Sequence, residues 1–227
     1  MWRYASALAI GTSHVRAGLP CQDRIICRTL SDGAIIVVVS DGAGSASSGE
    51  IGAEIATTVF CESIEAQLQR YDSSIDLLDA MQLAFADVRS AIQSRSAADS
   101  VAIREYAATL LAFVQTGDTV ATAQIGDGVI CLSDSSDSWS WFDWPQRGEY
   151  ANTTYFVTDR EAAAQVKVEL LSPAPTAVII MSDGLEPLAL NYASKVVHHE
   201  FAAPLVRRLR ESNSIGEDHA LSAALQT

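Results

Sequence analysis

Apolar and polar residues follow one another along this chain in two rhythms, one typical of strands and one typical of helices. Short apolar runs rich in β-branched residues and bounded by Gly, Asp or Ser predict buried strands. Apolar residues that recur every three or four positions predict amphipathic helices. Strands are expected at 24–30, 34–40, 107–115, 119–125, 129–132, 165–171 and 176–181, and helices at about 48–68 and 75–92.

The two ends of the chain and one internal segment carry weaker patterns. Residues 2–10 alternate as a first strand would, and residues 219–225 predict a last strand. Pro204 is expected to open a second helical segment within 194–211, because Pro is favoured in a first helical turn. Residues 133–154 hold three Trp residues among Ser, Asp, Pro and Gly. This composition predicts a long, flap-like surface excursion whose Trp rings fold back onto the body.

The order of the predicted elements indicates an α+β fold. Hairpins dominate and regular βαβ alternation is absent, so the sheets are expected to be mostly antiparallel. About ten strands are too many for one comfortable open sheet, which favours two stacked sheets flanked by helices. At this length the whole chain, residues 1–227, is most simply one domain.

The charge of the chain argues against two classes of partner. It carries 28 acidic and 15 basic residues, a formal net charge of −13. Nucleic acids and anionic membranes both require basic surfaces, so neither is expected to bind. The four cysteines show no CxxC pair and no zinc-like spacing, and no signal peptide or transmembrane-length apolar run is found. We therefore expect reduced thiols and a cytoplasmic location.

Two apolar strands end in the same triplet, Ser-Asp-Gly, at residues 40–42 and 182–184. A buried strand that ends in this way delivers a carboxylate to the rim of a sheet, so Asp41 and Asp183 are expected to meet at one site. Asp-Gly also forms ordinary turns, and that interpretation stays open for each acid alone. Further acids stand at predicted strand ends or turns: Asp23, Asp127 and Asp218.

Clustered carboxylates suit hard divalent cations. Mg²⁺ and Mn²⁺ prefer oxygen ligands and keep several waters, so a few carboxylates suffice to hold them. Two such ions about 4 Å apart can activate a bridging water and clamp a phosphoryl oxygen. Motifs for other chemistry are absent, since the sequence holds no GxSxG elbow, Walker loop, GxGxxG turn or HExxH pair.

Several short segments, taken in order, match the motifs of a known enzyme family. They read Cys21-Gln22-Asp23, Ser40-Asp41-Gly42-Ala43-Gly44, Ala108-Thr109-Leu110, Gly126-Asp127-Gly128, Ser182-Asp183-Gly184-Leu185 and Glu217-Asp218-His219. In this set the chain resembles the metal-dependent serine/threonine protein phosphatases of the 2C class, the PPM family, and within it a divergent bacterial branch. Each motif alone is weak, whereas the ordered set is specific and spans nearly the whole chain.

The resemblance implies a four-layer α-β-β-α sandwich that holds two Mn²⁺ or Mg²⁺ ions, with a third ion in bacterial members. It implies catalysis through Asp23, Asp41 and Asp183, by way of a metal-bridging hydroxide that attacks the phosphorus of phosphoserine or phosphothreonine. The implied metal-binding residues are Asp23, Asp41, Gly42 through its carbonyl, Asp127, Asp183 and Asp218.

The chain also departs from the family pattern. His14 stands where the family often has an Arg that holds the substrate phosphate, and Arg16 lies nearby as a substitute, so either is a candidate phosphate-binding residue. Gln22 replaces a Glu that orients metal-bound water. Ala43 stands where many eukaryotic members have a His proposed as general acid, and His219 replaces an Asn. These departures leave the implied metal ligands in place.

Three hypotheses about function follow. The first is a protein serine/threonine phosphatase that acts as a monomer on a phosphorylated protein, with a cognate Ser/Thr kinase as a further partner. The second is a weakly active or inactive phosphatase-like module that binds a phosphoprotein or a kinase. The third is a sporulation-type signalling phosphatase that shares the predicted fold but acts on the antagonist of an anti-sigma factor.

Overall fold

The larger of two stacked sheets is built from the predicted hairpins. The computed structural model describes residues 2–70, 76–146, 154–212 and 216–225. Five strands lie in the order β2-β3-β4-β5-β8, and each is antiparallel to its neighbours, as expected. Their bounds are β2 (Asp23–Thr29), β3 (Ile35–Asp41), β4 (Leu110–Thr116), β5 (Thr119–Ile125) and β8 (Lys167–Leu170).

Tight turns join these strands where the sequence places Gly. Gly33 turns the β2–β3 hairpin with a φ of 88°, and Gly117 turns the β4–β5 hairpin with a φ of 54°. Such positive values suit Gly because it has no Cβ. The first of these turns sets a register in which Asp23 lies directly opposite Asp41. A short hairpin thus brings two of the predicted site residues together.

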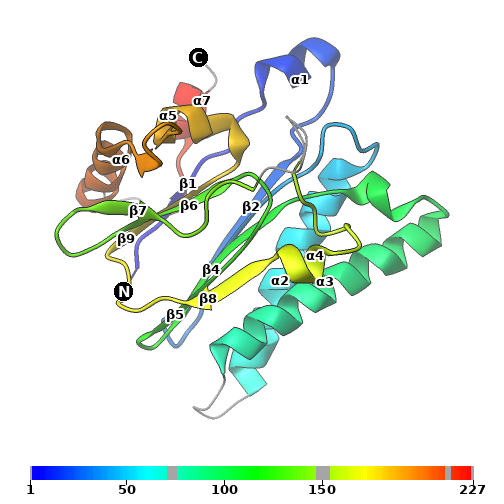
Figure 1. Ribbon diagram of the computed structural model, residues 1–227, viewed down its shortest axis with the longest axis horizontal. Helices are drawn as coiled ribbons and strands as arrows, with labels where there is room; N and C mark the ends of the chain where they lie inside the picture. The colour runs from blue at the N-terminus through cyan, green and yellow to red at the C-terminus, as the bar shows by residue number, and fades with distance from the viewer. Residues whose placement is uncertain (1, 71–75, 147–153, 213–215, 226–227) are drawn as a thin grey trace.

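Two long helices cover the outer face of the five-stranded sheet (Figure 1). They are α2 (Gly49–Arg70) and α3 (Leu77–Asp99). None of the helices in the described part of the chain is both long and apolar enough to cross a membrane. The core beneath them contains buried side chains from both layers, such as Phe60 of α2, Met81 of α3 and Leu110 of β4.

A second, three-stranded antiparallel sheet packs against the inner face of the first. It consists of β6 (Val129–Ser133), β7 (Trp139–Trp141) and β9 (Ala177–Met181), in the order β7-β6-β9. Apolar side chains from both sheets fill the space between them. Among them, Leu111 of the first sheet shares a buried cluster with Ile130 of the second.

Helices also cover the outer face of the second sheet (Figure 1). These are α5 (Glu186–Ala189) and α6 (His199–Glu211). Buried Met181 of β9 forms a cluster with Ala189 and Ala202, one from each helix. The molecule therefore has four layers in the order α-β-β-α, and the expected fold class is confirmed.

Short elements complete the fold and bring the ends of the chain together. β1 pairs in parallel with β12, so segments near the two termini lie side by side (Figure 1). The bounds of the short elements are β1 (Ala5–Ser6), α1 (Thr12–Ala17), η1 (Ile103–Tyr106), α4 (Ala162–Gln165), η2 (Asp183–Leu185), β10 (Leu190–Asn191), β11 (Val196–Val197), β12 (Gly216–Glu217) and α7 (His219–Leu225).

Two predictions about the chain ends are wrong. The strand expected over 2–10 is reduced to the two residues of β1. The strand expected over 219–225 is the helix α7 instead. Asp218 begins this helix, because its side chain accepts a hydrogen bond from the amide of Leu221 at 2.9 Å. An acid placed just before a short apolar segment favours a helix start, and this capping signal outweighs the alternation.

Pro204 does not open a second helix, as the sequence suggested, but lies inside the single helix α6. A Pro in a helix removes one backbone hydrogen bond. Ala202 and Val206, on either side of it, are both buried. Packing of this apolar face against the protein therefore outweighs the local cost of the Pro.

The segment predicted as an excursion is partly regular. Its strand β7 pairs with β6, so that Trp141 lies opposite Cys131. The apolar cluster between the second sheet and helices α5 and α6 is contacted by three Trp side chains, Trp139, Trp141 and Trp144. This confirms that the Trp rings fold back onto the body. Residues 147–153 of the predicted excursion lie outside the described residues.

Candidate metal centre

Asp41 ends strand β3, and its backbone is held by Thr109, which directly precedes the neighbouring strand β4. Its amide donates to Thr109 Oγ1 at 3.0 Å, and the Thr109 amide donates to the Asp41 carbonyl at 2.9 Å. The Ser40 hydroxyl donates to the Thr109 carbonyl at 2.6 Å. On the other side, Asp23 of β2 is the register partner of Asp41, so both side chains leave the same face of the sheet. Strand pairing therefore places two carboxylates beside each other.

Gly42 follows Asp41 at the closest approach between the turn and helix α2. Its amide donates to the Gln22 carbonyl at 3.1 Å. A Cβ on Gly42 would lie 2.3 Å from both the carbonyl carbon and the carbonyl oxygen of Gly49, where α2 begins. No side chain fits at this distance, so only Gly lets the turn pass under the helix start.

Two further acids reach this edge from the second sheet. β6 and β9 are antiparallel, so the turn before β6, which carries Asp127, and the turn after β9, which carries Asp183, lie at the same edge. The charges of Asp127 and Asp183, together with that of Asp23, act on Asp41. The structure therefore brings together four of the five predicted acids, two from each sheet.

The proximity of these acids is reflected in their protonation. Burial, followed by the charges of Asp23 and Asp183, raises the pKa of Asp41 to about 8. Burial also raises the pKa of Asp23, while a hydrogen bond from Ser182 acts in the opposite direction. Carboxylates that repel one another in this way lose charge unless a cation lies between them.

The donor set suits a hard divalent cation. Asp23 Oδ1 is buried and has no hydrogen-bond partner, which leaves its lone pairs for a ligand. All candidate donors are oxygens, as Mg²⁺ and Mn²⁺ prefer. Within the described ranges, no three His, Cys, Asp or Glu side chains already surround one point as ion ligands would. The oxygen donors that a cation would use are thus gathered at this edge, whereas no group of three ligands around one point is preformed among the described residues.

Asp218, the fifth predicted acid, is engaged elsewhere. It lies at the start of α7, where it forms an ion pair with Arg208 of α6 at 2.8 Å. Its amide donates to the carbonyl of Ser6 at 2.7 Å, which ties this turn to β1. The hydrogen bond from the Leu221 amide, with help from the Arg208 charge, holds the pKa of Asp218 below its usual range. The structure places this carboxylate with a cation of the protein itself.

His14 and Arg16 occupy different positions on α1. His14 Nε2 would lie 3.9 Å from a Cβ on Gly44, and its charge lowers the pKa of Asp23. Arg16 is exposed. Residues two apart on a helix do not share a face, so the two side chains leave α1 in different directions. Of the two predicted phosphate-binding residues, His14 is the one beside the carboxylates.

Two polar residues near the acids were not predicted to have a role. Thr109 fixes the backbone of Asp41, and Ser182 donates to Asp23. Both lie inside segments that match family motifs, and this is the one signal that the sequence offers. Their contacts come from strand pairing over long sequence distances, which a local pattern does not contain.

The thiols do not offer an alternative nucleophile. All four cysteines are free, as expected. Burial raises the pKa of Cys27 and of Cys61 to about 11 and that of Cys131 to about 12. Burial also raises the pKa of Cys21, the cysteine nearest to Asp23 in sequence. Thiols with such values stay protonated at neutral pH and react slowly.

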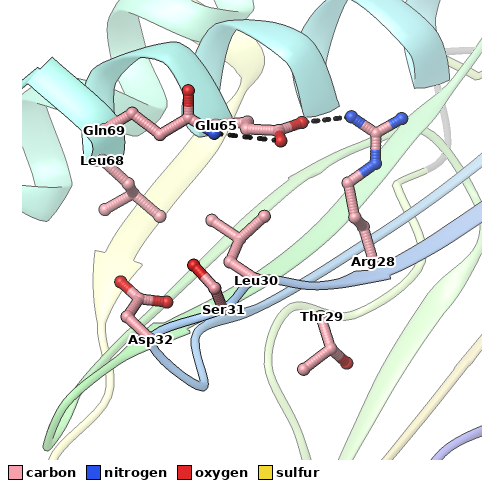
Figure 2. A pocket seen from close by; sticks show the side chains of 8 residues that line it. All are labelled: Arg28, Thr29, Leu30, Ser31, Asp32, Glu65, Leu68 and Gln69. Atoms are coloured by element: carbon pink, nitrogen blue, oxygen red, sulfur yellow. Dashed lines mark hydrogen bonds and ion pairs between the residues drawn. The ribbon is translucent and has the colours of Figure 1, made fainter.

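A hollow of about 400 Å³ lies at the other end of β2, away from the acids (Figure 2). Figure 2 shows the side chains of Arg28 and Glu65 directed at each other across its upper rim, where they form an ion pair. Glu65 also accepts a hydrogen bond from Gln69 at 3.1 Å. Among the described residues that line this hollow, Arg28 is the one cationic side chain and it is already neutralised, so they offer no free cation for a phosphate group.

The raised pKa of Asp41 predicts how the metal-free protein responds to pH. A carboxyl whose pKa is higher in the folded state binds its proton more tightly there, so stability falls as pH rises from about 4 towards 8. Thermal unfolding in EDTA should give a lower Tm at pH 8 than at pH 5, and Asp41→Asn should flatten this slope. An unchanged slope in Asp41→Asn would contradict the assignment.

Comparisons with known proteins agree with this arrangement. The protein phosphatase 2C family model matches residues 10–226. Serine/threonine-protein phosphatase 3 of Escherichia coli (strain K12) is 30% identical over 212 residues, which cover 92% of this chain and 83% of that protein.

Solved structures of low sequence identity share the fold. Serine/threonine phosphatase Stp1 from Staphylococcus aureus superposes with a TM-score of 0.56 at 12% identity, over 85% of this chain and 84% of that one. The catalytic domain of the serine/threonine protein phosphatase PstP, in complex with 2 manganese ions, gives a TM-score of 0.57 at 16% identity, over 84% of this chain and 85% of that one.

Proposed function

Because this chain belongs to the protein phosphatase 2C family, we propose that it hydrolyses phosphoserine and phosphothreonine in proteins with the help of divalent cations. The observation that carries the proposal is the strand register that sets Asp23 opposite Asp41 at the edge where Asp183 also lies. Two Mn²⁺ or Mg²⁺ ions bound there would lower the pKa of a water, supply the nucleophile and neutralise charge on the phosphoryl oxygens.

The chain supplies the positions of the ligands. Asp23, Asp41 and Asp183 would hold the ions, with the carbonyl of Gly42 as a neutral ligand. Asp127 would serve a third ion, as the family resemblance implies. Strand pairing within both sheets supports these positions, because it brings the oxygen donors to one edge of the sandwich. Asp218 would join them only after leaving Arg208, so its role as a ligand requires that ion pair to open.

Substrate binding is assigned to the surroundings of the acids. His14 would contact a phosphate oxygen, because it lies at the same edge and its charge acts on Asp23. The substrate is a phosphorylated protein, and a cognate Ser/Thr kinase would be a further partner. We further propose that the protein is one domain, acts as a monomer and is cytoplasmic, without nucleic acid or membrane as partner.

The direct test is release of phosphate from a phosphothreonine peptide by the purified protein. We expect hydrolysis with Mn²⁺ present and loss of activity in excess EDTA, with recovery when Mn²⁺ is added back. The same peptide carrying phosphotyrosine is the control for substrate class. Turnover that is indifferent to EDTA would contradict the proposal.

A second function is favoured by one observation, the ion pair that holds Asp218 away from the other acids. If this pair persists in solution, the protein would be a weakly active or inactive module that binds a phosphoprotein or a kinase. Calorimetry separates the two functions, because tight Mn²⁺ binding without turnover indicates the module. Replacing Arg208 with Ala would then increase activity strongly, whereas in a competent phosphatase, where the ion pair already opens when cations bind, the increase should be small.

His14 and Arg16 offer a matched pair for the phosphate contact. We expect His14→Ala to raise KM for the phosphopeptide by about 10-fold, the effect of losing one charge-assisted hydrogen bond, while Arg16→Ala changes KM little. Steady-state kinetics at saturating Mn²⁺ measure both. An increase in KM for Arg16→Ala but not His14→Ala would transfer the role to Arg16.

A further inference from the structure

The turn Gly126-Asp127-Gly128 is held by a residue that lies outside the motifs of the sequence. We infer that Gln146 is the positioning residue of this turn and thereby sets the place of Asp127 relative to Asp41. The inference rests on the proposed function, because it concerns how one proposed metal ligand is held. It concerns a glutamine, which is neither charged nor a ligand itself.

Gln146 forms hydrogen bonds with Gly126 through both its backbone and its side chain. The Gln146 amide donates to the Gly126 carbonyl at 3.1 Å, and the Gly126 amide donates to Gln146 Oε1 at 3.1 Å. Gln146 Nε2 then donates to Asp143 Oδ2 at 3.2 Å and to the Gln165 carbonyl at 3.0 Å. The Thr154 hydroxyl donates to the Gln146 carbonyl at 2.9 Å. One residue thus ties the turn to the end of α4 and to the segment after β7.

On its other sides the turn is tightly packed against neighbouring residues, so it has little room to move. Gly126 has a φ of 113°, and a Cβ there would lie 2.5 Å from Thr109 Cγ2. A Cβ on Gly128 would lie 2.5 Å from Leu111 Cδ1 and 2.7 Å from the Met181 carbonyl oxygen. Thr109 is the residue that fixes the Asp41 backbone. The turn that carries Asp127 therefore packs against Thr109, the residue that fixes the Asp41 backbone, and the hydrogen bonds of Gln146 hold it in that position.

A buried neighbour extends the same network. Gln124 is fully buried, and its Nε2 donates to the Gly128 carbonyl at 3.1 Å and to the Asp143 carbonyl at 3.2 Å. Lys167 lies 3.9 Å from Asp143 and donates to the Phe142 carbonyl at 2.9 Å. The partner of Gln146 Nε2 is therefore itself held from two sides. Gln124 Oε1 has no hydrogen-bond partner among the described residues, so the hold on Asp143 and on the turn comes from the donors Gln124 Nε2, Gln146 Nε2 and Lys167. Hydrogen bonds that converge in this way restrict the movement of the turn, which is what the fixed placement of a ligand requires.

The consequence is a change in metal affinity with little change in substrate binding. Partners that hold a ligand in place typically matter by about 10- to 100-fold in metal affinity. Gln146→Leu keeps the backbone hydrogen bonds but removes both side-chain groups. We expect it to raise the Mn²⁺ concentration for half-maximal hydrolysis of p-nitrophenyl phosphate by about 10-fold. KM for this substrate at saturating Mn²⁺ should stay within about 2-fold.

The matched control is Gln115→Leu, the same substitution at the far end of β4. Gln115 also accepts a side-chain hydrogen bond, from Trp2 Nε1, and donates one to the Gly117 carbonyl at 2.9 Å. Gln115→Leu therefore removes comparable side-chain hydrogen bonds but leaves the turn at Gly126-Asp127-Gly128 unchanged. We expect a similar loss of thermal stability in both variants but a change in the Mn²⁺ dependence in Gln146→Leu alone.

A double-mutant cycle and calorimetry complete the test. Asp127→Asn should shift the Mn²⁺ dependence in the same direction, and adding Gln146→Leu to it should produce no further shift, because both act on one ligand. Mn²⁺ titration by calorimetry should show the weakened site without any turnover. Should Gln146→Leu be too unstable at the assay temperature, Gln146→Asn keeps the polarity but is one methylene shorter and should shift the dependence likewise.

The outcomes separate this inference from the proposed function. Mn²⁺-dependent activity in the wild type, with Gln146→Leu behaving like Gln115→Leu, would overturn the inference and leave the function standing. Additive shifts from Asp127→Asn and Gln146→Leu would also overturn it. Absence of Mn²⁺-dependent hydrolysis in the wild type would overturn the proposed function instead, and calorimetry would still report whether Gln146 affects Mn²⁺ binding.

Discussion

Asp41→Asn is expected to lower Mn²⁺-dependent hydrolysis by about 100-fold or more and, at the same time, to stabilise the metal-free protein. Asp41 lies where the charges of Asp23, Asp183 and Asp127 converge, so it is the acid whose loss removes most of the proposed ion site. Without an ion, the same convergence is a source of repulsion. Activity and stability should therefore change in opposite directions.

The stabilising effect can be measured separately from activity. Burial and the charges of Asp23 and Asp183 raise the pKa of Asp41 to about 8, so at that pH the carboxylate opposes folding. Relief of about 1 kcal/mol corresponds to an increase in Tm of roughly 2–4 °C for a chain of this size. Thermal unfolding at pH 8 in EDTA measures it, and Mn²⁺ should raise the Tm of the wild type more than that of the variant.

Asp118→Asn is the matched control for this prediction. Asp118 is exposed in the turn between β4 and β5, at the end of the sheet opposite to Asp41. The substitution removes the same charge from the chain, and we expect it to change neither activity nor Tm beyond small surface effects. If Asp41→Asn retained full activity, or lowered the Tm in EDTA, the acid cluster would not be an ion site.

The layers of the fold could be predicted because each strand and helix carries its own pattern. The run at 35–39 is apolar at every position and, apart from half-buried Val37, is buried between α2 and the second sheet. The helix α3 has an apolar stripe with helical spacing, and its members are buried. In such segments local preference and tertiary packing agree, so the sequence is sufficient.

At the two ends of the chain this agreement fails. β1 owes its conformation to a distant part of the chain, since it pairs with β12 across more than two hundred residues. α7 begins at the cap formed by Asp218, whose own backbone is bonded to Ser6 of β1. Pro204 stays within α6 because the helix packs on the second sheet. Short segments of this kind contain too few residues for their own periodicity to decide between strand and helix.

The candidate site shows the same division. Asp23 and Asp41 meet through a local hairpin, and the sequence signals its turn with Ser31-Asp32-Gly33, so their proximity was predictable. Asp183 joins them through the pairing of β6 and β9. The sequence indicated this proximity only through the resemblance to the family motifs. The ion pair between Asp218 and Arg208 was not predictable, because charges ten residues apart on two helices carry no signature of contact.

Gly42→Ala is expected to disrupt the site through the backbone, although it removes no ligand side chain. The new Cβ would lie 2.3 Å from the carbonyl carbon and oxygen of Gly49 and 2.8 Å from the amide nitrogen of Glu50. These are backbone atoms at the start of α2 and cannot rotate away, so the turn or the helix must move. Overpacking of this kind costs on the order of 3 kcal/mol.

Gly44→Ala is the control, because it is the same substitution two residues away. A Cβ on Gly44 meets only Gln22 Oε1 at 3.8 Å and His14 Nε2 at 3.9 Å, which are ordinary contacts. We expect urea denaturation to show a large loss of stability for Gly42→Ala and little change for Gly44→Ala.

Calorimetric titration with Mn²⁺ shows whether the moved backbone also displaces the ligands. Affinity should fall for Gly42→Ala, because the carbonyl of Gly42 and the side chain of Asp41 are fixed by the same turn, through the hydrogen bonds of Asp41 to Thr109 and of Gly42 to Gln22. Equal stability and equal Mn²⁺ affinity in the two variants would mean that the turn does not need Gly at position 42. In that case the backbone at position 42 would not be part of the ion site, and side chains alone would have to hold the cations.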